Sequence, residues 1–128
     1  SDLGPALTIR ADKLMLQRAL SNLLSNAIRH AVAHSKVVIM IRPLADQVEI
    51  IVQNQGPVIE AEHLPRLFER FYRADPSRQR HSEGAGLGLA MVKSIAELHG
   101  GTISASSVLN DNQEPGQAQT DFILRWPR

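Results

Sequence analysis

The segment from Asp12 to Val32 constrains the fold of this chain more than any other part of it. Leucine and alanine recur there at the 3.6-residue period of an α-helix, at Leu16, Leu20, Leu23, Leu24, Ala27 and Ala31. Asp12 stands where a carboxylate accepts hydrogen bonds from the free amides of a first helical turn. Because the apolar face of so long a helix has to be buried against a second layer, the segment favours a layered domain.

Short segments rich in β-formers lie on both sides of this helix in the sequence. Strands are predicted over residues 6–10, 36–42, 47–53, 102–107 and 119–126, and further helices over about 61–72 and 87–99. Residues 54–60 are rich in turn formers, and Gly100-Gly101 ends the last helix. This order predicts an α/β two-layer sandwich, a mixed and largely antiparallel sheet covered on one face by helices, with residues 1–128 as one domain.

The composition narrows the range of functions. Of the 128 residues 43% are hydrophobic, which is enough for a packed core, and no cysteine is present for a disulfide or a thiolate metal site. The 14 basic and 13 acidic residues give a net charge of +1, so binding to nucleic acid is not expected. No apolar run approaches the roughly 20 residues of a membrane span, so we expect no membrane segment in this domain.

A polar stripe lies opposite the leucines of the first helix. Asn22, Asn26, Arg29 and His30 follow the i, i+4, i+7, i+8 spacing of one helical face. A neutral amide oxygen suits a hard cation such as Mg2+, and the two basic residues suit phosphate or ribose oxygens. The alternative is a solvated helix face, which is the more frequent meaning of a polar stripe taken alone.

Glycines at every second position precede the last helix, in Gly84-Ala85-Gly86-Leu87-Gly88-Leu89. Glycine lets a backbone approach a ligand closely, and the amides at a helix N-terminus attract phosphate. The segment does not follow a strand of a βαβ unit, which excludes a dinucleotide-binding fingerprint, and no Gly-Lys-Ser/Thr follows. A flexible hinge at the helix start is the alternative. The polar residues 74–86 before the helix are predicted to form a functional loop.

Four segments stand in a fixed order along the chain. They are NLLSNAIRH at 22–30, NQGPVI at 54–59, LFERFYR at 67–73 and GAGLGL at 84–89. The set resembles the N, G1, F and G2 boxes of the catalytic ATP-binding domain of bacterial two-component sensor histidine kinases, within the superfamily shared with gyrase, Hsp90 and MutL. The resemblance runs from about residue 8 to 127, and residues 65–101 are most similar to kinases of the copper/silver heavy-metal sensor type.

This resemblance implies a site for ATP and Mg2+. Asn26 would bind the Mg2+ ion, Asn22 would support the metal or the phosphates, and Arg73 would reach the terminal phosphate, so these three are the expected catalytic residues. Residues 74–86 would form the ATP lid. The residues expected to contact the nucleotide are Asn22, Asn26, Arg29, His30, Asn54, Gly56, Ile59, Phe71, Arg73, Gly84, Gly86, Leu87, Gly88, Leu89 and Thr120. Phe68 and Phe71 would anchor the base of the lid, with core packing as a compatible alternative.

The base-binding segment departs from the family pattern. The G1 box usually reads Asp-x-Gly-x-Gly, and its carboxylate accepts a hydrogen bond from the adenine amino group. Asn54 stands in that place and Val58 replaces the second glycine. An amide oxygen still accepts the bond but without charge assistance, so we expect weaker recognition of adenine. Gln119-Thr120 stands where Gly-Thr is common; Thr120 would reach adenine through a water or serve only as a strand residue.

Asn22 separates the kinase branch of the superfamily from the ATPase branches. Gyrase-like and Hsp90-like ATPases carry a glutamate there as general base for water, and an amide cannot take that proton. Phosphoryl transfer needs positioning and charge neutralisation more than an activated water. His30 and His34, at i and i+4, would also suit a transition metal, although no third ligand is evident.

The resemblance also implies partners. The histidine that receives the phosphoryl group would lie on a dimerisation and phosphoacceptor domain of the same kinase, and a response regulator would act downstream. The domain on its own is expected to be a monomer, and to be the cytoplasmic part of an inner-membrane sensor kinase. The altered G1 box leaves an alternative, a nucleotide-binding or regulatory interaction module that no longer catalyses.

Overall fold

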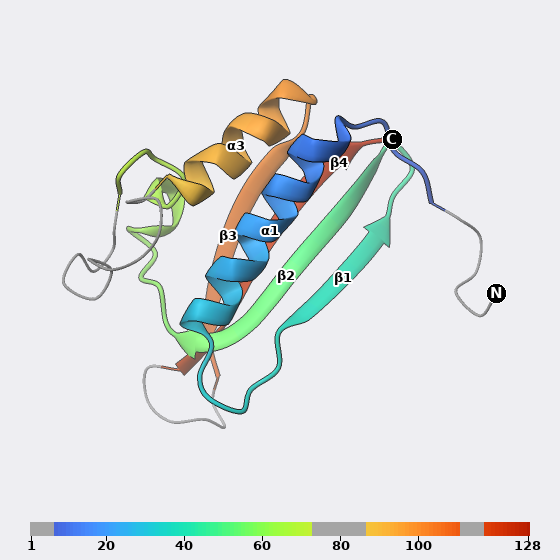
Figure 1. Cartoon of the computed structure of the whole chain (residues 1–128). Coiled ribbons are helices and arrows are strands. Elements are labelled where there is room, and N and C mark those ends of the chain that lie inside the picture. The colour runs from blue at the N-terminus through green and yellow to red at the C-terminus, as the bar shows by residue number, and fades with distance from the viewer. Residues whose placement is uncertain (1–6, 73–86, 111–116) are drawn as a thin grey trace.

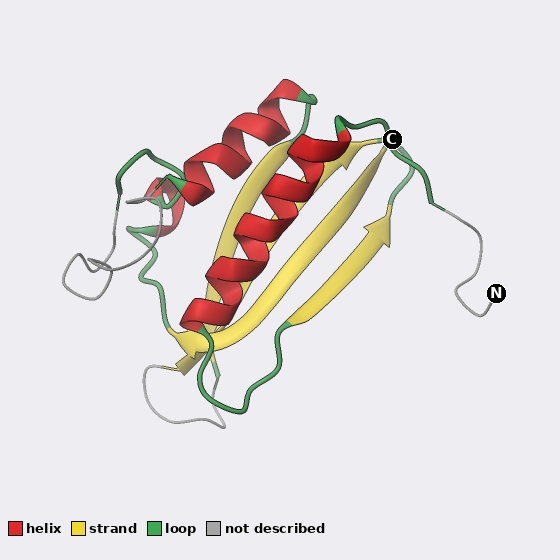
Figure 2. Cartoon of the chain, viewed as in Figure 1, coloured by secondary structure: helices red, strands yellow, loops and turns green. Residues whose placement is uncertain are grey.

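The computed structural model describes residues 7–72, 87–110 and 117–128. In these ranges the chain forms, in order, α1 (Lys13–His30), β1 (Val38–Pro43), β2 (Gln47–Pro57), the 3-10 turn η1 (Leu64–Arg66), α3 (Gly88–Leu98), β3 (Thr102–Leu109) and β4 (Gln117–Pro127). Figures 1 and 2 show two layers, with both helices on the same face of a twisted sheet. The predicted α/β two-layer sandwich is confirmed.

The sheet has the strand order β1-β2-β4-β3. Each neighbouring pair of described strands is antiparallel, so the sheet of the described residues is antiparallel rather than mixed. Thr120 of β4 is paired with Asn54 of β2 on one side and with Ser107 of β3 on the other. Since side chains alternate between the faces of a strand, these three share the face that the helices cover.

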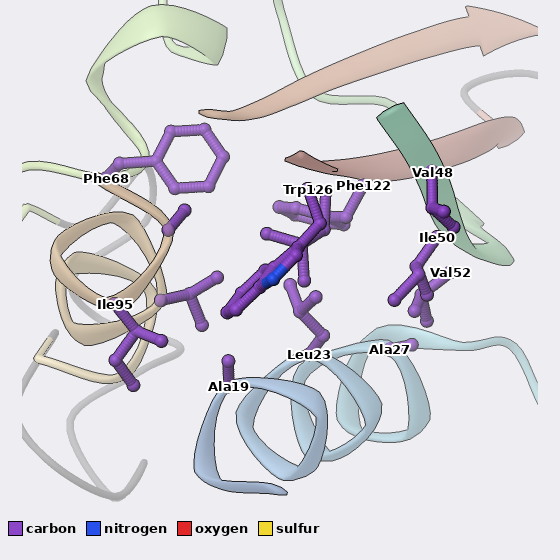
Figure 3. Close-up of a cluster of buried hydrophobic side chains, with 13 residues drawn as sticks. Ala19, Leu23, Ala27, Val48, Ile50, Val52, Phe68, Ile95, Phe122 and Trp126 are labelled. Carbon is purple, nitrogen blue, oxygen red and sulfur yellow. The ribbon is translucent and has the colours of Figure 1, made fainter. Parts of the chain in front are cut away.

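The core lies between the helices and this face of the sheet, as Figure 3 shows. Its largest fully buried side chains are Trp126, Phe122, Leu23, Leu124, Val48, Val52 and Val92. Ala19 and Ala27 are also fully buried on α1, and these small side chains let the helix lie close to the strands. Phe68 joins this core edge-to-face with Phe122, at 6.1 Å between ring centroids.

The predicted start of α1 and the predicted end of α3 are present, whereas α1 ends at His30, two residues before the predicted Val32. Asp12 is the N-cap of α1, and its Oδ1 accepts a hydrogen bond of 3.0 Å from the Met15 amide. α3 ends before Gly100, whose φ of +77° belongs to the left-handed region that glycine occupies without strain. His99 joins these two ends, because its Nε2 accepts from the Asp12 amide at 3.1 Å and its ring lies 4.4 Å from that of Trp126.

Three predicted elements differ from the structure. Residues 7–10 are not a strand; the Arg10 carbonyl instead accepts a hydrogen bond from the Trp126 indole at 2.8 Å. The helix predicted over 61–72 is reduced to η1 and turns, and Phe71, with a φ of +66°, leaves the right-handed helical conformation altogether. β2 continues through residues 54–57, which were predicted to be irregular, because β4 pairs with them along their whole length.

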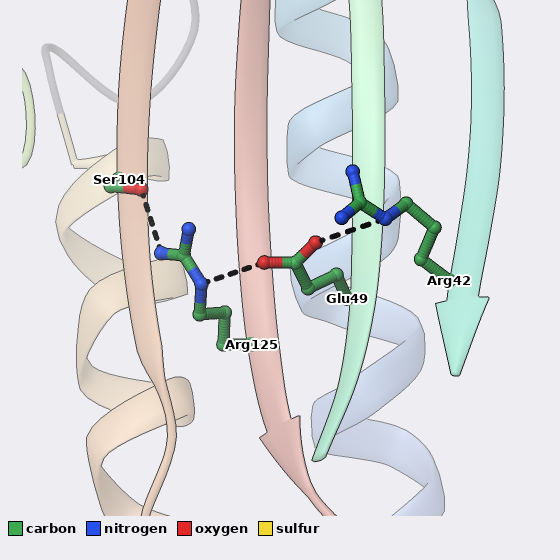
Figure 4. A network of polar contacts seen from close by, with 4 residues as sticks. All are labelled: Arg42, Glu49, Ser104 and Arg125. Atoms are coloured by element: carbon green, nitrogen blue, oxygen red, sulfur yellow. Dashed lines mark hydrogen bonds and ion pairs between the residues drawn. The ribbon is translucent and has the colours of Figure 1, made fainter. Parts of the chain in front are cut away.

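The other face of the sheet carries a polar network (Figure 4). Glu49 lies between two arginines, with its carboxylate 3.5 Å from Arg42 Nε and 2.9 Å from Arg125 Nε. Arg125 also donates to the Ser104 hydroxyl at 3.2 Å. In Figure 4 the helices lie behind the strands, so this network is on the face opposite the helices and takes no part in the site described next.

Candidate nucleotide-binding site

Asn22 and Asn26 lie one turn apart on α1, on the side that faces α3. The Asn22 amide donates to Met91 Sδ at 3.6 Å, and a Cβ at Gly88 would lie 3.5 Å from Asn22 Oδ1. The structure therefore brings Asn22, the first residue of the polar stripe, against the first residue of α3. Asn26 is only 8% exposed, which excludes the solvated-face alternative for this residue, whereas Arg29 is exposed.

The first turn of α3 provides free backbone donors beside Asn22. Leu87 is its N-cap residue and makes no side-chain capping bond. The first amides of an α-helix have no partner within the helix, and no side-chain cap from the described residues occupies them here. This turn, which contains Gly88 and Leu89, can therefore accept an anion. We call Asn22, Asn26, Gly88 and Leu89 the phosphate end of the site.

A second polar group lies on the strands. Asn54 and Thr120 are 3% and 2% exposed, and they are paired across β2 and β4. The Thr120 hydroxyl is 2.9 Å from the Ser107 hydroxyl, which accepts a hydrogen bond of 3.0 Å from the Ile59 amide. We call Asn54, Ile59, Ser107 and Thr120 the base end. Ser107 was missed by the sequence analysis, because only the register of β3 against β4 reveals it.

Gly56 fixes the position of the base end relative to α1. A Cβ at Gly56 would lie 2.4 Å from the His30 carbonyl oxygen, a distance that real side chains do not reach. The Val32 amide donates to the Gln55 carbonyl at 2.8 Å beside it. The C-terminus of α1 thus touches β2 two residues beyond Asn54. His30 lies eight residues after Asn22 along α1, a rise of about 12 Å, so α1 joins the two ends of the site.

The two phenylalanines of the third box separate in the structure. Phe68 is in the core, as core packing predicts, but Phe71 is 65% exposed with its backbone in the left-handed region. Tyr72 follows it and is held by a hydrogen bond between its hydroxyl and His63 Nδ1, and by the Arg66 guanidinium, which lies 4.5 Å from the centre of its ring. The chain is therefore fixed at residue 72. No pattern in the sequence marks His63 for this contact.

Several predicted site residues lie outside the described residues. They are Arg73, Gly84 and Gly86, with the whole predicted lid of residues 74–86. Within the described ranges no three His, Cys, Asp or Glu side chains gather where they could hold a metal ion, and so His30 and His34 have no third ligand there. No helix in the described part of the chain is long and apolar enough to cross a membrane.

Comparison with known proteins identifies the same class of domain that the fold and the candidate site suggest. The family model described as histidine kinase-, DNA gyrase B-, and HSP90-like ATPase matches residues 11–128. Sensor histidine kinase CusS of Escherichia coli (strain K12) is 52% identical over 104 residues, which cover 81% of this chain and 22% of CusS. Probable sensor kinase SilS of Salmonella typhimurium is 42% identical over 125 residues, which cover 98% of this chain and 24% of SilS.

The fold is also shared with solved kinases. Full-length ShkA in complex with AMPPNP matches with a TM-score of 0.75 at 28% identity, over 96% of this chain and 23% of ShkA. This chain thus spans about a quarter of the length of CusS, SilS and full-length ShkA. The four boxes, the sandwich and these matches together show that the chain belongs to the histidine kinase-, DNA gyrase B- and HSP90-like ATPase family, as a histidine kinase catalytic domain.

Proposed function

We propose that this domain binds Mg-ATP and transfers the γ-phosphoryl group to a histidine on a separate dimerisation and phosphoacceptor domain of the same kinase. The observation that carries the proposal is the phosphate end, where the amide of Asn22 lies against the first residue of α3 and Asn26 is one turn away. Oxygen ligands for Mg2+ and free amides for phosphate then lie side by side.

Asn26 suits the role of Mg2+ ligand. It is 8% exposed, so its amide is shielded from bulk water, and it is neutral, so the triphosphate supplies the negative charge that the ion needs. When bound, Mg2+ would neutralise charge on the transferring phosphoryl group. Asn22 would contact the metal or the phosphates from the same helix face. Arg73, Gly84 and Gly86 keep the phosphate-binding roles that the family resemblance implies.

Asn22 favours phosphoryl transfer over hydrolysis. An amide at this position cannot remove a proton from water, so the domain lacks that route to an activated nucleophile. In the transfer, the bond between the γ-phosphorus and the ADP oxygen breaks, a bond from the phosphorus to an imidazole nitrogen forms, and the imidazole proton leaves to solvent. The contribution of this chain is to position the triphosphate and to stabilise its charge.

The base end would receive adenine. Asn54 Oδ1 would accept a hydrogen bond from the 6-amino group, with Thr120 beside it. Gly56, Ile59, Leu87, Leu89 and Phe71 would complete the nucleotide site, and Arg29 and His30 would contact phosphate or ribose.

The parent protein is proposed to be a two-component sensor kinase for heavy metals such as copper or silver. The support is the name and identity of the relatives, which include sensor histidine kinase CusS and probable sensor kinase SilS. In that setting the domain would be the cytoplasmic part of an inner-membrane protein, and a response regulator would receive the phosphoryl group. On its own the domain would be a monomer.

Titration with a fluorescent ATP analogue, with and without Mg2+, tests the binding step. We expect saturable binding that Mg2+ strengthens. Absence of saturable binding at millimolar nucleotide would overturn the proposal. The transfer step is tested by adding the helical phosphoacceptor domain of the parent kinase in trans with labelled ATP. We expect rapid labelling of that domain, and the label should be lost in acid, as phosphohistidine requires.

A second candidate function is a nucleotide-binding or regulatory module without catalysis, and the observation that favours it is Asn54 in place of the usual carboxylate. It predicts nucleotide binding with no labelling of the acceptor domain. The trans-phosphorylation experiment therefore separates the two functions, because both bind the analogue and only the kinase labels its partner.

A further inference from the structure

The side chain of Asn54 is almost fully buried, and no hydrogen bond to another described side chain fixes the orientation of its amide. The residue is 3% exposed, and within the described part of the chain its side chain has no hydrogen-bond partner. The nearest polar side chain across the strands is that of Thr120, whose hydroxyl is already bonded to Ser107. A 180° rotation of the amide, which exchanges its oxygen and nitrogen, therefore breaks no hydrogen bond to these residues.

An amide and a carboxylate present different groups to a purine base. An amide has a donor and an acceptor side by side, whereas an ionised carboxylate only accepts. A 6-aminopurine presents a donor at N6 and an acceptor at N1, and a 6-oxopurine presents an acceptor at O6 and a donor at N1. An amide matches either edge after rotation, but a carboxylate faces the 6-oxo group with two acceptors.

The hydroxyls at the base end can also act either as hydrogen-bond donors or as acceptors. The Ser107 oxygen accepts from the Ile59 amide at 3.0 Å, and either hydroxyl of the Ser107–Thr120 pair can be the donor. If Ser107 donates, the Thr120 hydroxyl is free to donate to a ligand; if Thr120 donates, its oxygen is free to accept. Neither Asn54 nor Thr120 therefore imposes a fixed donor or acceptor pattern.

In the described ranges, no buried charged side chain at the base end fixes which atoms of the base must donate or accept a hydrogen bond. Among the described residues the buried polar side chains are Asn26, Glu49, Asn54 and Thr120. Of these only Glu49 is an acid, and it lies on the opposite face of the sheet, paired with Arg42 and Arg125 (Figure 4). Asp121, the next residue after Thr120, is also on that face and accepts from Gln53 at 3.0 Å.

We infer that Asn54 is the residue that sets base specificity, and that it makes the site accept 6-oxopurine nucleoside triphosphates as well as ATP. The inference rests on the proposed nucleotide-binding function. The substrate class is then purine nucleoside triphosphates that carry either an amino group or an oxo group at C6. Inosine triphosphate is the direct probe, because it has the 6-oxo group and the N1 proton but lacks the 2-amino group of guanine.

The test is equilibrium binding of ATP and inosine triphosphate, with Mg2+, to the domain of residues 1–128. For the unaltered chain we expect the two dissociation constants to differ by less than about fivefold, since both bases make the same number of hydrogen bonds. In Asn54→Asp the inosine triphosphate should bind at least about tenfold more weakly than ATP, because an acceptor then opposes an acceptor.

Gln119→Glu is the matched control. It adds the same charge one residue from Thr120, but on the face away from the helices, so the ratio of the two dissociation constants should stay as in the unaltered chain. If Asn54→Asp does not fold, the ratio measured on the unaltered chain decides. A ratio above about fivefold for the unaltered chain, or an unchanged ratio in folded Asn54→Asp, overturns the inference. Failure of both nucleotides to bind overturns the proposed function instead.

Discussion

The two ends of the proposed nucleotide site are built in different ways. At the base end, Asn54 and Thr120 are almost fully buried, hydroxyls lie 2.9 Å apart, and a Cβ at Gly56 would overlap the His30 carbonyl. At the phosphate end, the nearest contact to a Cβ at Gly88 is an ordinary 3.5 Å, and within the described ranges the Asn22 side chain makes one long hydrogen bond, to Met91 Sδ at 3.6 Å. The base end is preformed and tightly packed, and the phosphate end has room.

This difference predicts how substitutions will act. Changes at the base end remove close contacts between strands and helix, so they should lower the free energy of unfolding as well as binding. Changes at the phosphate end remove groups that face a ligand, so they should lower nucleotide affinity and leave the free energy of unfolding nearly unchanged. Each of the following four substitutions tests that division.

Gly56→Ala should have the largest effect. The new Cβ would lie 2.4 Å from a backbone carbonyl of α1, which cannot rotate away, so the helix terminus has to move from β2. We expect the free energy of unfolding to fall by about 3 kcal/mol, measured by urea denaturation. A loss below about 1 kcal/mol would show that the contact between α1 and β2 is not tight.

Asn26→Ala should mainly weaken binding. Removal of the amide oxygen takes a ligand from the proposed Mg2+ site, so the affinity for Mg-nucleotide should fall by about thirtyfold, or about 2 kcal/mol. The affinity measured in EDTA should stay the same. Ser25→Ala, at the exposed neighbouring position, is the control. Equal losses with and without the metal would contradict a role for Asn26 in binding Mg2+.

Ser107→Ala should have a smaller effect on stability. It leaves the Ile59 amide and the Thr120 hydroxyl without their partner, which costs about 1 kcal/mol in the free energy of unfolding. Nucleotide affinity should fall too, because Thr120 loses its orientation. Ser106→Ala, on the other face of β3, should change neither quantity. If the two serine variants behave alike in urea denaturation and nucleotide titration, the hydrogen-bond chain does not stabilise the base end.

The contrast between the phosphate end and the base end also explains which parts of the site can be predicted from the sequence. Asn22 and Asn26 are one helical turn apart, so periodicity alone places them together. Asn54, Ser107 and Thr120 come from three strands, and only the register of β2, β4 and β3 brings them together. Composition and turn signals do not determine register. Similarly, the left-handed backbone at Phe71, within the segment where a helix was predicted, has no local signal in the residue itself.

Gly88→Ala should have the smallest effect on stability and so gives the sharpest contrast with Gly56→Ala. Both replace a glycine of the site by alanine, but here the new Cβ meets Asn22 Oδ1 at an ordinary contact distance in the first turn of α3. The free energy of unfolding should therefore change by less than about 0.5 kcal/mol. Nucleotide affinity should nevertheless fall, because the methyl group lies between the Asn22 amide and the helix N-terminus where phosphate is proposed to bind. Urea denaturation and Mg-nucleotide titration of the same variant separate the two quantities. If Gly88→Ala loses as much stability as Gly56→Ala, the phosphate end is packed as tightly as the base end. If Gly88→Ala keeps full nucleotide affinity, the phosphates bind elsewhere.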